Sequence, residues 1–354
     1  MRITNNKNNK TIKNLESMKK VFLILFIAMT AMTSVQAQQI SVVKDDGSTT
    51  LHRTLAEAIA AIEDGCVIYL PGGGFTIADD VKITKRVTII GTGHKTVTDN
   101  VDGNTTISGN LFFNVGSSQS AIMGCYITGT VVIGEDGAVN DVLVRYCNLN
   151  SVQVKNSECQ ETFVNQNYIR STSSFGGTNA EITNNIMHSV RGLKNGLLSH
   201  NIILSYYTYD AGSPGYSWPV YTAINADLSR IKFNIIIEQN REVGRTYRTI
   251  LQGGSNEIVS NMVLCGFGES DVRPTDSDWN NLFVNYNGGA INTNSDFHFK
   301  DEYKDYESQV GIYAGTKFSD EQKAPTPYII EKEIDEQTDA QGKLKIKISV
   351  KANQ

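Results

Sequence analysis

A six-residue pattern recurs seven times in this chain and restricts its fold more than any other feature. An apolar residue is followed three positions later by Asn or Cys, and two positions after that by another apolar residue. The Asn or Cys of each copy, called here the ladder position, falls at Cys125, Cys147, Asn167, Asn185, Asn201, Asn234 and Asn261. Successive ladder positions lie 22, 20, 18, 16, 33 and 27 residues apart. A period near twenty with occasional longer excursions is typical of a solenoid.

The spacing within each copy requires a bend. Apolar residues three before and two after the ladder position cannot share one face of a straight strand, because side chains alternate with period two. Asn tolerates the left-handed backbone of a sharp bend, and stacked Asn side chains can bond one another along the axis. A second turn signal, such as Gly176-Gly177 or Gly253-Gly254, precedes each copy. Two bends and a variable loop predict an all-β, parallel β-helix with three short strands per coil.

The first 37 residues are predicted to be a signal peptide rather than part of the fold. Lys19-Lys20 precede the apolar run 21–32, and Val35-Gln36-Ala37 places small residues where signal peptidase cleaves, after Ala37. The run is shorter than the ~20 residues that a membrane span needs. We therefore expect a secreted protein, extracellular or periplasmic, with no membrane span in the mature chain. Residues 38–320 are predicted to form the β-helix, and 321–354 a C-terminal β-strand tail.

The charge of the mature chain limits its partners. The whole chain carries 32 basic and 37 acidic residues, and the signal segment removes six basic residues and one acidic residue. The remaining excess of acidic residues argues against a nucleic-acid partner, which would favour a basic face. We expect a monomer.

The five Cys residues cannot form a disulfide framework without leaving one single. Cys125 and Cys147 share the ladder position on adjacent coils, about 4.8 Å apart, which is within the reach of a disulfide. We expect buried thiols that replace Asn in the stack, with the disulfide as the alternative.

The beginning of the mature chain resembles a known superfamily. Thr54-Leu55-Ala56-Glu57 predicts a capped helix over the open end of the solenoid. The stretches IYLPGGGFTI and VKITKRVTIIGTG and the Asn-marked coils follow it. This order resembles secreted right-handed parallel β-helix proteins of the pectate-lyase-like superfamily, over roughly residues 40 to 315. At the other end, residues 328–334 and 343–351 are predicted to be two strands of a hairpin or tail.

Three long excursions, at 205–226, 239–253 and 266–281, leave the coils at one register. Because neighbouring coils lie about 4.8 Å apart, these loops are expected to emerge side by side. Aromatic side chains suit the apolar faces of sugars. The candidate substrate-binding residues are Tyr209, Asp210, Trp218, Tyr221 and Tyr247. Polysaccharide is therefore the expected partner.

The resemblance implies a chemistry for the same surface. Lyases of the superfamily eliminate across a uronic acid, with a base and with Arg or Ca²⁺ to neutralise the carboxylate. The matching candidates are Arg191, Arg245 and Arg248. The chain departs from the family in two ways: Arg245-Thr246-Tyr247-Arg248 lacks the Pro of the lyase motif, and the calcium-binding stretch of those lyases is absent. No protein metal site is predicted, and Ca²⁺ is left open. Two functions follow: a divergent polysaccharide lyase, or a non-catalytic surface or adhesion protein.

Overall fold

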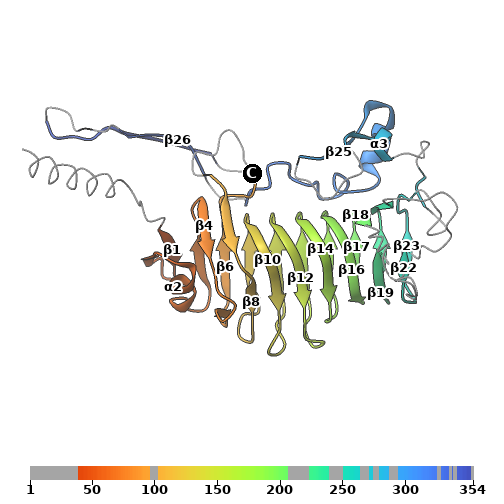
Figure 1. The fold of residues 1–354 in the computed structure, drawn as a ribbon, viewed down its shortest axis with the longest axis horizontal. Coiled ribbons are helices and arrows are strands. Elements are labelled where there is room, and N and C mark those ends of the chain that lie inside the picture. Colours follow the sequence, from red (N-terminus) through yellow and green to blue (C-terminus); the bar gives the residue numbers. More distant parts are fainter. Residues whose placement is uncertain are drawn as a thin grey trace, which may run out of the picture. The chain divides into compact units, whose positions relative to one another are not determined.

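Strands of this chain alternate between two long parallel sheets, called here sheet A and sheet B (Figure 1). The structure is a computed structural model that describes residues 39–95, 103–205, 223–238, 250–263, 271–273, 279–286, 294–324, 328–334, 337 and 341–351. All of them belong to one unit, residues 39–354. The signal segment predicted at 1–37 lies outside the described residues. None of the helices described is long and apolar enough to cross a membrane.

Sheet A has eleven strands among the described residues. In spatial order they are β2 (Thr49–His52), β1 (Ile40–Val43), β3 (Cys66–Tyr69), β6 (Val87–Ile90), β9 (Ala121–Met123), β11 (Val142–Arg145), β13 (Thr162–Asn165), β15 (Glu181–Thr183), β17 (Leu197–Ser199), β20 (Arg230–Lys232) and β23 (Glu257–Val259). From β3 onward every pairing in this sheet is parallel, whereas β1 pairs antiparallel with β2 and β3.

Sheet B contains twelve strands in the described part of the chain. Its main path is β4 (Gly73–Thr76), β7 (Thr105–Ser108), β10 (Tyr126–Ile133), β12 (Asn148–Val154), β14 (Tyr168–Phe175), β16 (Ile186–Lys194), β18 (Ile202–Ser205) and β21 (Ile235–Glu238), with β5 (Lys82–Ile83), β8 (Leu111–Phe113), β19 (Ile224–Asp227) and β22 (Leu251–Gln252) attached. Register shifts interrupt β10, β12, β14 and β16 midway. In the next two repeats β18 and β19, and likewise β21 and β22, are separate strands, and the residues between them lie outside the described ranges. The long parallel sheets are consistent with a parallel β-helix.

The inward side chains of both sheets form one apolar core. Those of sheet A include Ile89, Ile122, Val144, Val164, Ile182, Leu198 and Ile231, and those of sheet B include Ile107, Ile127, Leu149, Ile169, Met187, Ile203 and Ile236. All of them have no exposed surface. They include both apolar residues that flank each of the first six ladder positions; at the seventh, Val263 is fully buried and Ile258 is partly exposed. The recurring pattern thus places nearly all of its apolar residues in the core, as the sequence predicts.

The ladder positions form a continuous column of buried amides. Asn167, Asn185, Asn201 and Asn234 each donate Nδ2–H to the Oδ1 of the next Asn, over 2.9–3.0 Å, and the last acceptor is Asn261. Each of these four also donates its backbone N–H to the same Oδ1. The column predicted from the sequence is therefore confirmed for these five residues.

The bend itself differs from the prediction in one respect. The left-handed backbone belongs to the residue before the ladder position, and the Asn is not the strained residue. Tyr146, Gln166, Asn184, His200, Phe233 and Ser260 have φ between 52° and 58°. The Asn is selected instead because its amide can both donate and accept between repeats, which a left-handed backbone alone would not require.

Cys125 and Cys147 continue the column as thiols. Both are free and fully buried, and Cys147 donates its backbone N–H to Asn167 Oδ1. Burial raises the pKa of the Cys147 thiol to about 12, so the thiolate that would attack an oxidant is scarce. The structure thus has the thiol arrangement expected from the sequence and not the alternative disulfide.

A helix and a hairpin flank the repeats along the chain. Helix α2 (Leu55–Ala60) begins at Thr54, whose side chain accepts the Glu57 N–H while the Glu57 carboxylate accepts the Thr54 N–H. This confirms the predicted capping box. Near the C-terminus β26 (Tyr328–Ile334) and β27 (Ile346–Lys351) pair antiparallel as the predicted hairpin, and the second strand begins three residues later than expected.

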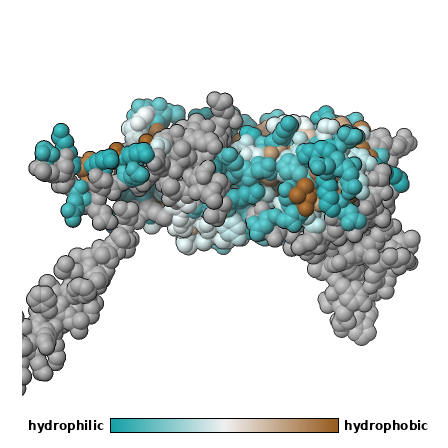
Figure 2. Space-filling model, turned by 90° about the horizontal axis from the view of Figure 1, so that it is seen from above, coloured by the Kyte–Doolittle hydropathy of each residue, from teal (hydrophilic) through white to brown (hydrophobic). Residues whose placement is uncertain are grey.

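Residues 294–324, called here the docked segment, cover part of the outer side of sheet B (Figure 1). The segment contains β25 (Asp296–Phe299) and the 3₁₀ helix η1 (Asp301–Ser308). Strand β25 pairs with β24 (Phe283–Asn285), which precedes the segment and follows the short helix α3 (Trp279–Leu282). Its apolar residues, among them Phe297, Ile312 and Phe318, form a second core with outward side chains of the repeats. Figure 2 shows the side where the segment lies, and its described surface is largely hydrophilic.

The outward side chains under the docked segment explain why it binds there. Tyr168, Ile186, Ile202 and Ile235 directly follow ladder positions and point away from the main core, yet each is at most 2% exposed. An uncovered column of this kind would expose apolar surface to water. The docked segment removes that surface, and the Asn184 side chain fixes its path by donating to Ile312 O and Ala314 O.

Replacement of one ladder residue should destabilise the fold strongly. Asn201→Ala removes the side-chain donor to Ile182 O and the acceptor of the Asn185 N–H, and both of these groups are buried. We expect a loss of about 3 kcal/mol or more in the free energy of unfolding. Denaturant titration measures it, with Glu257→Ala, an exposed residue of β23, as the matched control that changes it by about 0.5 kcal/mol at most. Equal midpoints for the two variants would contradict the ladder as a source of stability.

Candidate functional site

The edge of sheet B where β18 and β21 end is called here the loop-bearing edge. Ser205, the last residue of β18, pairs with Glu238, the last residue of β21. The chain returns at Ile224 and Leu251, which also pair with each other. The excursions 206–222 and 239–249 therefore leave from adjacent residues and return at adjacent residues. The excursions themselves lie outside the described residues.

The third excursion begins one strand further along. Met262 bridges to Ile235 of β21 on one side and to Val272 on the other, so the chain leaves beside β21 and is back beside Met262 at Val272, within the range 266–281 predicted for this excursion. The first two departures share one register, because Ser205 pairs with Glu238, whereas the common register of the third with these two stays a prediction.

Arg191 is the one sequence-predicted site residue that the structure describes. It is exposed on β16, opposite Ser174 of β14. The next residue, Gly192, donates its N–H to Asn225 Oδ1 over 3.0 Å, and Asn225 follows the return of the first excursion by only a few residues. Arg191 thus lies on the strand next to the foot of that excursion, with its guanidinium accessible to a ligand.

The other candidates lie outside the described residues, so no geometry joins them to Arg191. They are Tyr209, Asp210, Trp218 and Tyr221 in the first excursion and Arg245, Tyr247 and Arg248 in the second. The strand ends that anchor the two excursions are adjacent, and the convergence of these side chains remains a prediction.

His188 is a neighbour of Arg191 that sequence reasoning did not select. It lies three residues before Arg191 on β16 and is partly exposed. Burial, and secondarily the positive charge of Arg191, lower the pKa of His188 below its ordinary value. At neutral pH its imidazole is therefore mostly uncharged and able to accept a proton. The only hint in the sequence was that both residues fall in one predicted strand.

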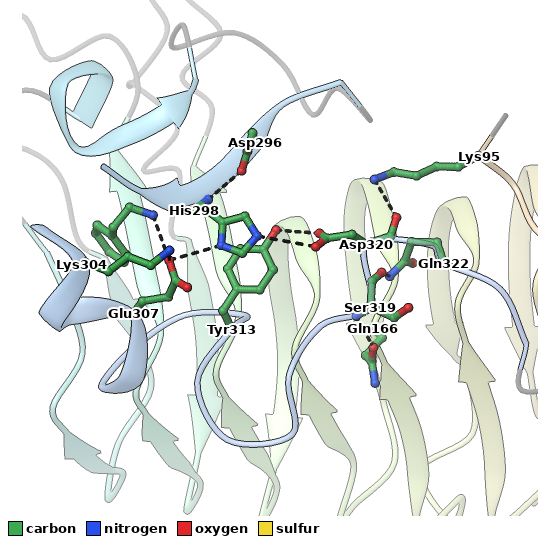
Figure 3. A network of polar contacts seen from close by, with 11 residues as sticks. Lys95, Gln166, Asp296, His298, Lys304, Glu307, Tyr313, Ser319, Asp320 and Gln322 are labelled. Atoms are coloured by element: carbon green, nitrogen blue, oxygen red, sulfur yellow. Dashed lines mark hydrogen bonds and ion pairs between the residues drawn. The ribbon is translucent and has the colours of Figure 1, made fainter. Parts of the chain in front are cut away.

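A group of polar side chains in mutual contact, which the sequence did not predict, lies on the docked segment (Figure 3). The imidazole of His298 stacks on the ring of Tyr313, with 3.7 Å between ring centroids. Its Nδ1 lies 3.2 Å from a carboxylate oxygen of Glu307, and its Nε2 lies 3.5 Å from one of Asp320. The Tyr313 hydroxyl donates to the other Asp320 oxygen over 2.8 Å. The His298 imidazole therefore has a carboxylate beside each nitrogen.

The environment of this group fixes the protonation of two of its members. Burial opposes ionisation of Glu307, but Lys304, His298 and the Phe299 N–H together outweigh it and lower the pKa of this carboxyl. Burial, and next the charge of Asp320, raise the pKa of Tyr313, so its hydroxyl stays protonated and donates. The group is thus built to hold the docked segment together by charge-assisted hydrogen bonds.

The polar network continues from the docked segment to the repeats. Ser319 donates its N–H to Gln166 Oε1 over 2.7 Å, and Lys95 Nζ donates to Asp320 O over 3.1 Å (Figure 3). His94 Nε2 lies 3.3 Å from Gln322 Oε1, and its ring meets Tyr168 edge-on. Burial lowers the pKa of His94 to about 4.

No group of three or more His, Cys, Asp or Glu side chains within the described ranges is arranged to hold a metal ion. A Ca²⁺ ion at the excursions therefore stays a prediction.

Comparisons with known proteins add no relative. No protein-family model matches the chain, and neither a curated protein nor a solved structure matches it.

The buried state of His94 makes stability depend on pH. In the unfolded chain a His takes up its proton as the pH falls through about 6.5, whereas folded His94 resists protonation until about 4. The contribution is present above 6.5 and is lost as the pH falls towards 4, by on the order of 3 kcal/mol. His94→Phe keeps a ring against Tyr168 and should lose less stability across this window. Unfolding free energies at stepped pH measure the difference, and parallel curves for the two proteins would refute it.

Proposed function

We propose that this chain is a secreted, right-handed parallel β-helix protein of the pectate-lyase-like kind, and that its loop-bearing edge engages a polysaccharide containing uronic acids. Two features support the fold assignment: the strands alternate between two parallel sheets, and one Asn column joins successive repeats. Connections between parallel strands are right-handed in nearly all proteins, which supports the hand.

One observation carries the function. The excursions 206–222 and 239–249 start at the paired residues Ser205 and Glu238 and end at the paired residues Ile224 and Leu251. Because the two segments are anchored on both sides at strand spacing, we expect them to share one surface. A rigid sheet that presents clustered loops is a common basis for ligand binding.

The composition of these loops suits an acidic sugar chain. Tyr209, Trp218, Tyr221 and Tyr247 supply rings for the apolar faces of sugars, and Asp210 supplies an acceptor for hydroxyl groups. Arg245, Arg248 and the exposed Arg191 supply cations for carboxylates. The chain as a whole is acidic, so the rest of its surface does not attract polyanions. These arginines are therefore the proposed place of attachment for an acidic polysaccharide.

The catalytic form of the proposal is a β-elimination. A base removes the proton at C5 of the uronate, the electron pair forms a C4–C5 double bond, and the C4–O bond breaks so that the leaving oxygen takes up a proton. Arg191 with Arg245 and Arg248 would neutralise the carboxylate beside C5. His188 is the described base closest along the chain to Arg191, and it is mostly uncharged at neutral pH.

Binding and turnover can be tested together. The mature protein is titrated with polygalacturonate and alginate, and absorbance of the unsaturated product is followed. Arg191→Ala should weaken binding about tenfold, because it removes a charge-assisted contact with a carboxylate. Arg53→Ala, which removes an exposed positive charge before α2, serves as the control for net charge and should leave affinity unchanged.

The outcomes separate the two functions. Product formation that is lost in Arg248→Ala supports the lyase, and binding without product supports the non-catalytic surface protein. Equal affinity of the wild type, Arg191→Ala and Arg53→Ala for every uronate polymer would reject the loop-bearing edge as the binding surface.

Secretion is a separate prediction. Expression of the full chain in a bacterium with an export pathway should yield a protein whose first residue is Gln38, because signal peptidase cleaves after small residues such as Ala37. N-terminal sequencing of the exported fraction checks it. Retention of the whole chain in the cytoplasm, with Met1 or Met18 at its start, would contradict it.

A further inference from the structure

A shallow groove of about 460 Å³ lies on the outer face of sheet A, away from the strand ends that carry the excursions. Residues of β15, β17 and β20 and of the turns before them line it. Those that matter for its chemistry are Asn179, Glu181, Asn195, Leu197, Leu228 and Arg230. Together they provide a carboxylate, a guanidinium, two amides and two apolar side chains.

The strand register sets the layout of the groove floor. Glu181 pairs with Leu197, and Leu197 pairs with Arg230, so the three occupy one row across neighbouring strands. Strands in a sheet lie about 4.8 Å apart, which places the Glu181 and Arg230 backbones about 10 Å apart with Leu197 between them. An apolar surface thus lies between a carboxylate and a guanidinium.

Arg230 is available to a ligand. It is exposed, and Glu257 pairs with it on the next strand of the same row. Although carboxylates flank it at Glu181 and Glu257, its side chain makes no ion pair or hydrogen bond with any residue that the structure describes. An arginine fork left open beside an apolar floor suits a ligand carboxylate, which it can bind through two parallel hydrogen bonds.

Leu228 at the rim is in a strained conformation without the usual compensation. Its φ of 53° is left-handed, and it occupies the bend position that Asn179, Asn195 and Ser255 occupy in neighbouring repeats. Asn adopts this conformation readily, and Asn195 also donates to Asn179 over 2.6 Å, but Leu is poorly suited to it. Leu228 is 66% exposed, so burial does not offset the strain. Other non-glycine residues occupy left-handed bends in this fold, Glu161 at the equivalent position among them, so the feature that distinguishes Leu228 is its exposure beside Arg230.

We propose that this groove binds one acidic sugar residue of a saccharide chain. Leu197 and Leu228 contact an apolar face of the ring, Arg230 binds the carboxylate, and Glu181 with the two Asn amides binds hydroxyl groups. The saccharide class rests on the proposed function, but the surface is separate from the loop-bearing edge. A chain held at both places would be gripped more tightly than at either alone.

The test uses the mature protein with Arg191→Ala as background, so that the loop-bearing edge is weakened. Calorimetric titration with a galacturonate trisaccharide compares this background with versions that also carry Arg230→Ala, Leu228→Asn or Arg53→Ala. Arg230→Ala should weaken binding about tenfold, as loss of a charged hydrogen-bonding partner does. Leu228→Asn should weaken binding while raising the melting temperature, because Asn relieves the left-handed strain. Arg53→Ala should change neither.

A second ligand separates charge from shape. The methyl ester of the same trisaccharide lacks the carboxylate charge and should bind the Arg230-containing protein about as weakly as the acid binds Arg230→Ala. Equal affinity for acid and ester, or an unchanged affinity in both Arg230→Ala and Leu228→Asn, would overturn the groove as an acidic-sugar site. If wild-type binding is lost with Arg191→Ala alone, the groove is rejected while the proposed function stands. If Arg191→Ala has no effect and Arg230→Ala abolishes binding, the groove is supported and the loop-bearing edge fails.

Discussion

The column of buried Asn amides is the interaction on which the arrangement of this chain depends. The amides of Asn185, Asn201 and Asn234 each accept two hydrogen bonds from the preceding ladder residue, and each donates both to the following one and to a backbone carbonyl. These groups have no access to water, so a repeat that shifted by one residue would leave several of them unsatisfied. The register between repeats is therefore fixed locally, at every bend.

Because the register is fixed, equivalent residues of successive repeats lie side by side on the outer surfaces. Ser205 and Glu238 are adjacent although 33 residues separate their two ladder Asn, Asn201 and Asn234, because the excursion between them begins and ends at fixed places. The same rule aligns Glu181, Leu197 and Arg230 across sheet A. Excursions of different length are tolerated because loop closure costs rise slowly with length.

The sequence was informative where the physics is local and periodic. The ladder, the inward apolar residues and the Thr54–Glu57 cap could be predicted because each rests on residues a few positions apart. The docked segment could not, since Gln166 with Ser319 and Asn184 with Ile312 join residues that no periodicity relates. His298 gained partners only when Glu307 and Asp320 folded beside it. The apolar residues directly after successive ladder positions were an available signal, because alternation requires those positions to face outward.

The outer faces of the two sheets differ in whether their apolar side chains are covered. Between the sheets the described interior is filled by apolar side chains and by the buried Asn column, so the described surfaces open to a ligand lie outside it. Along sheet B the docked segment covers the outward apolar column, and the His298 group ties that segment to itself. The described part of sheet A has no such cover at Leu197 and Leu228, where apolar side chains stand beside an open arginine. Other large apolar side chains, such as Leu51 and Val115, are also exposed, so the feature that distinguishes this place is the open arginine beside Leu197 and Leu228.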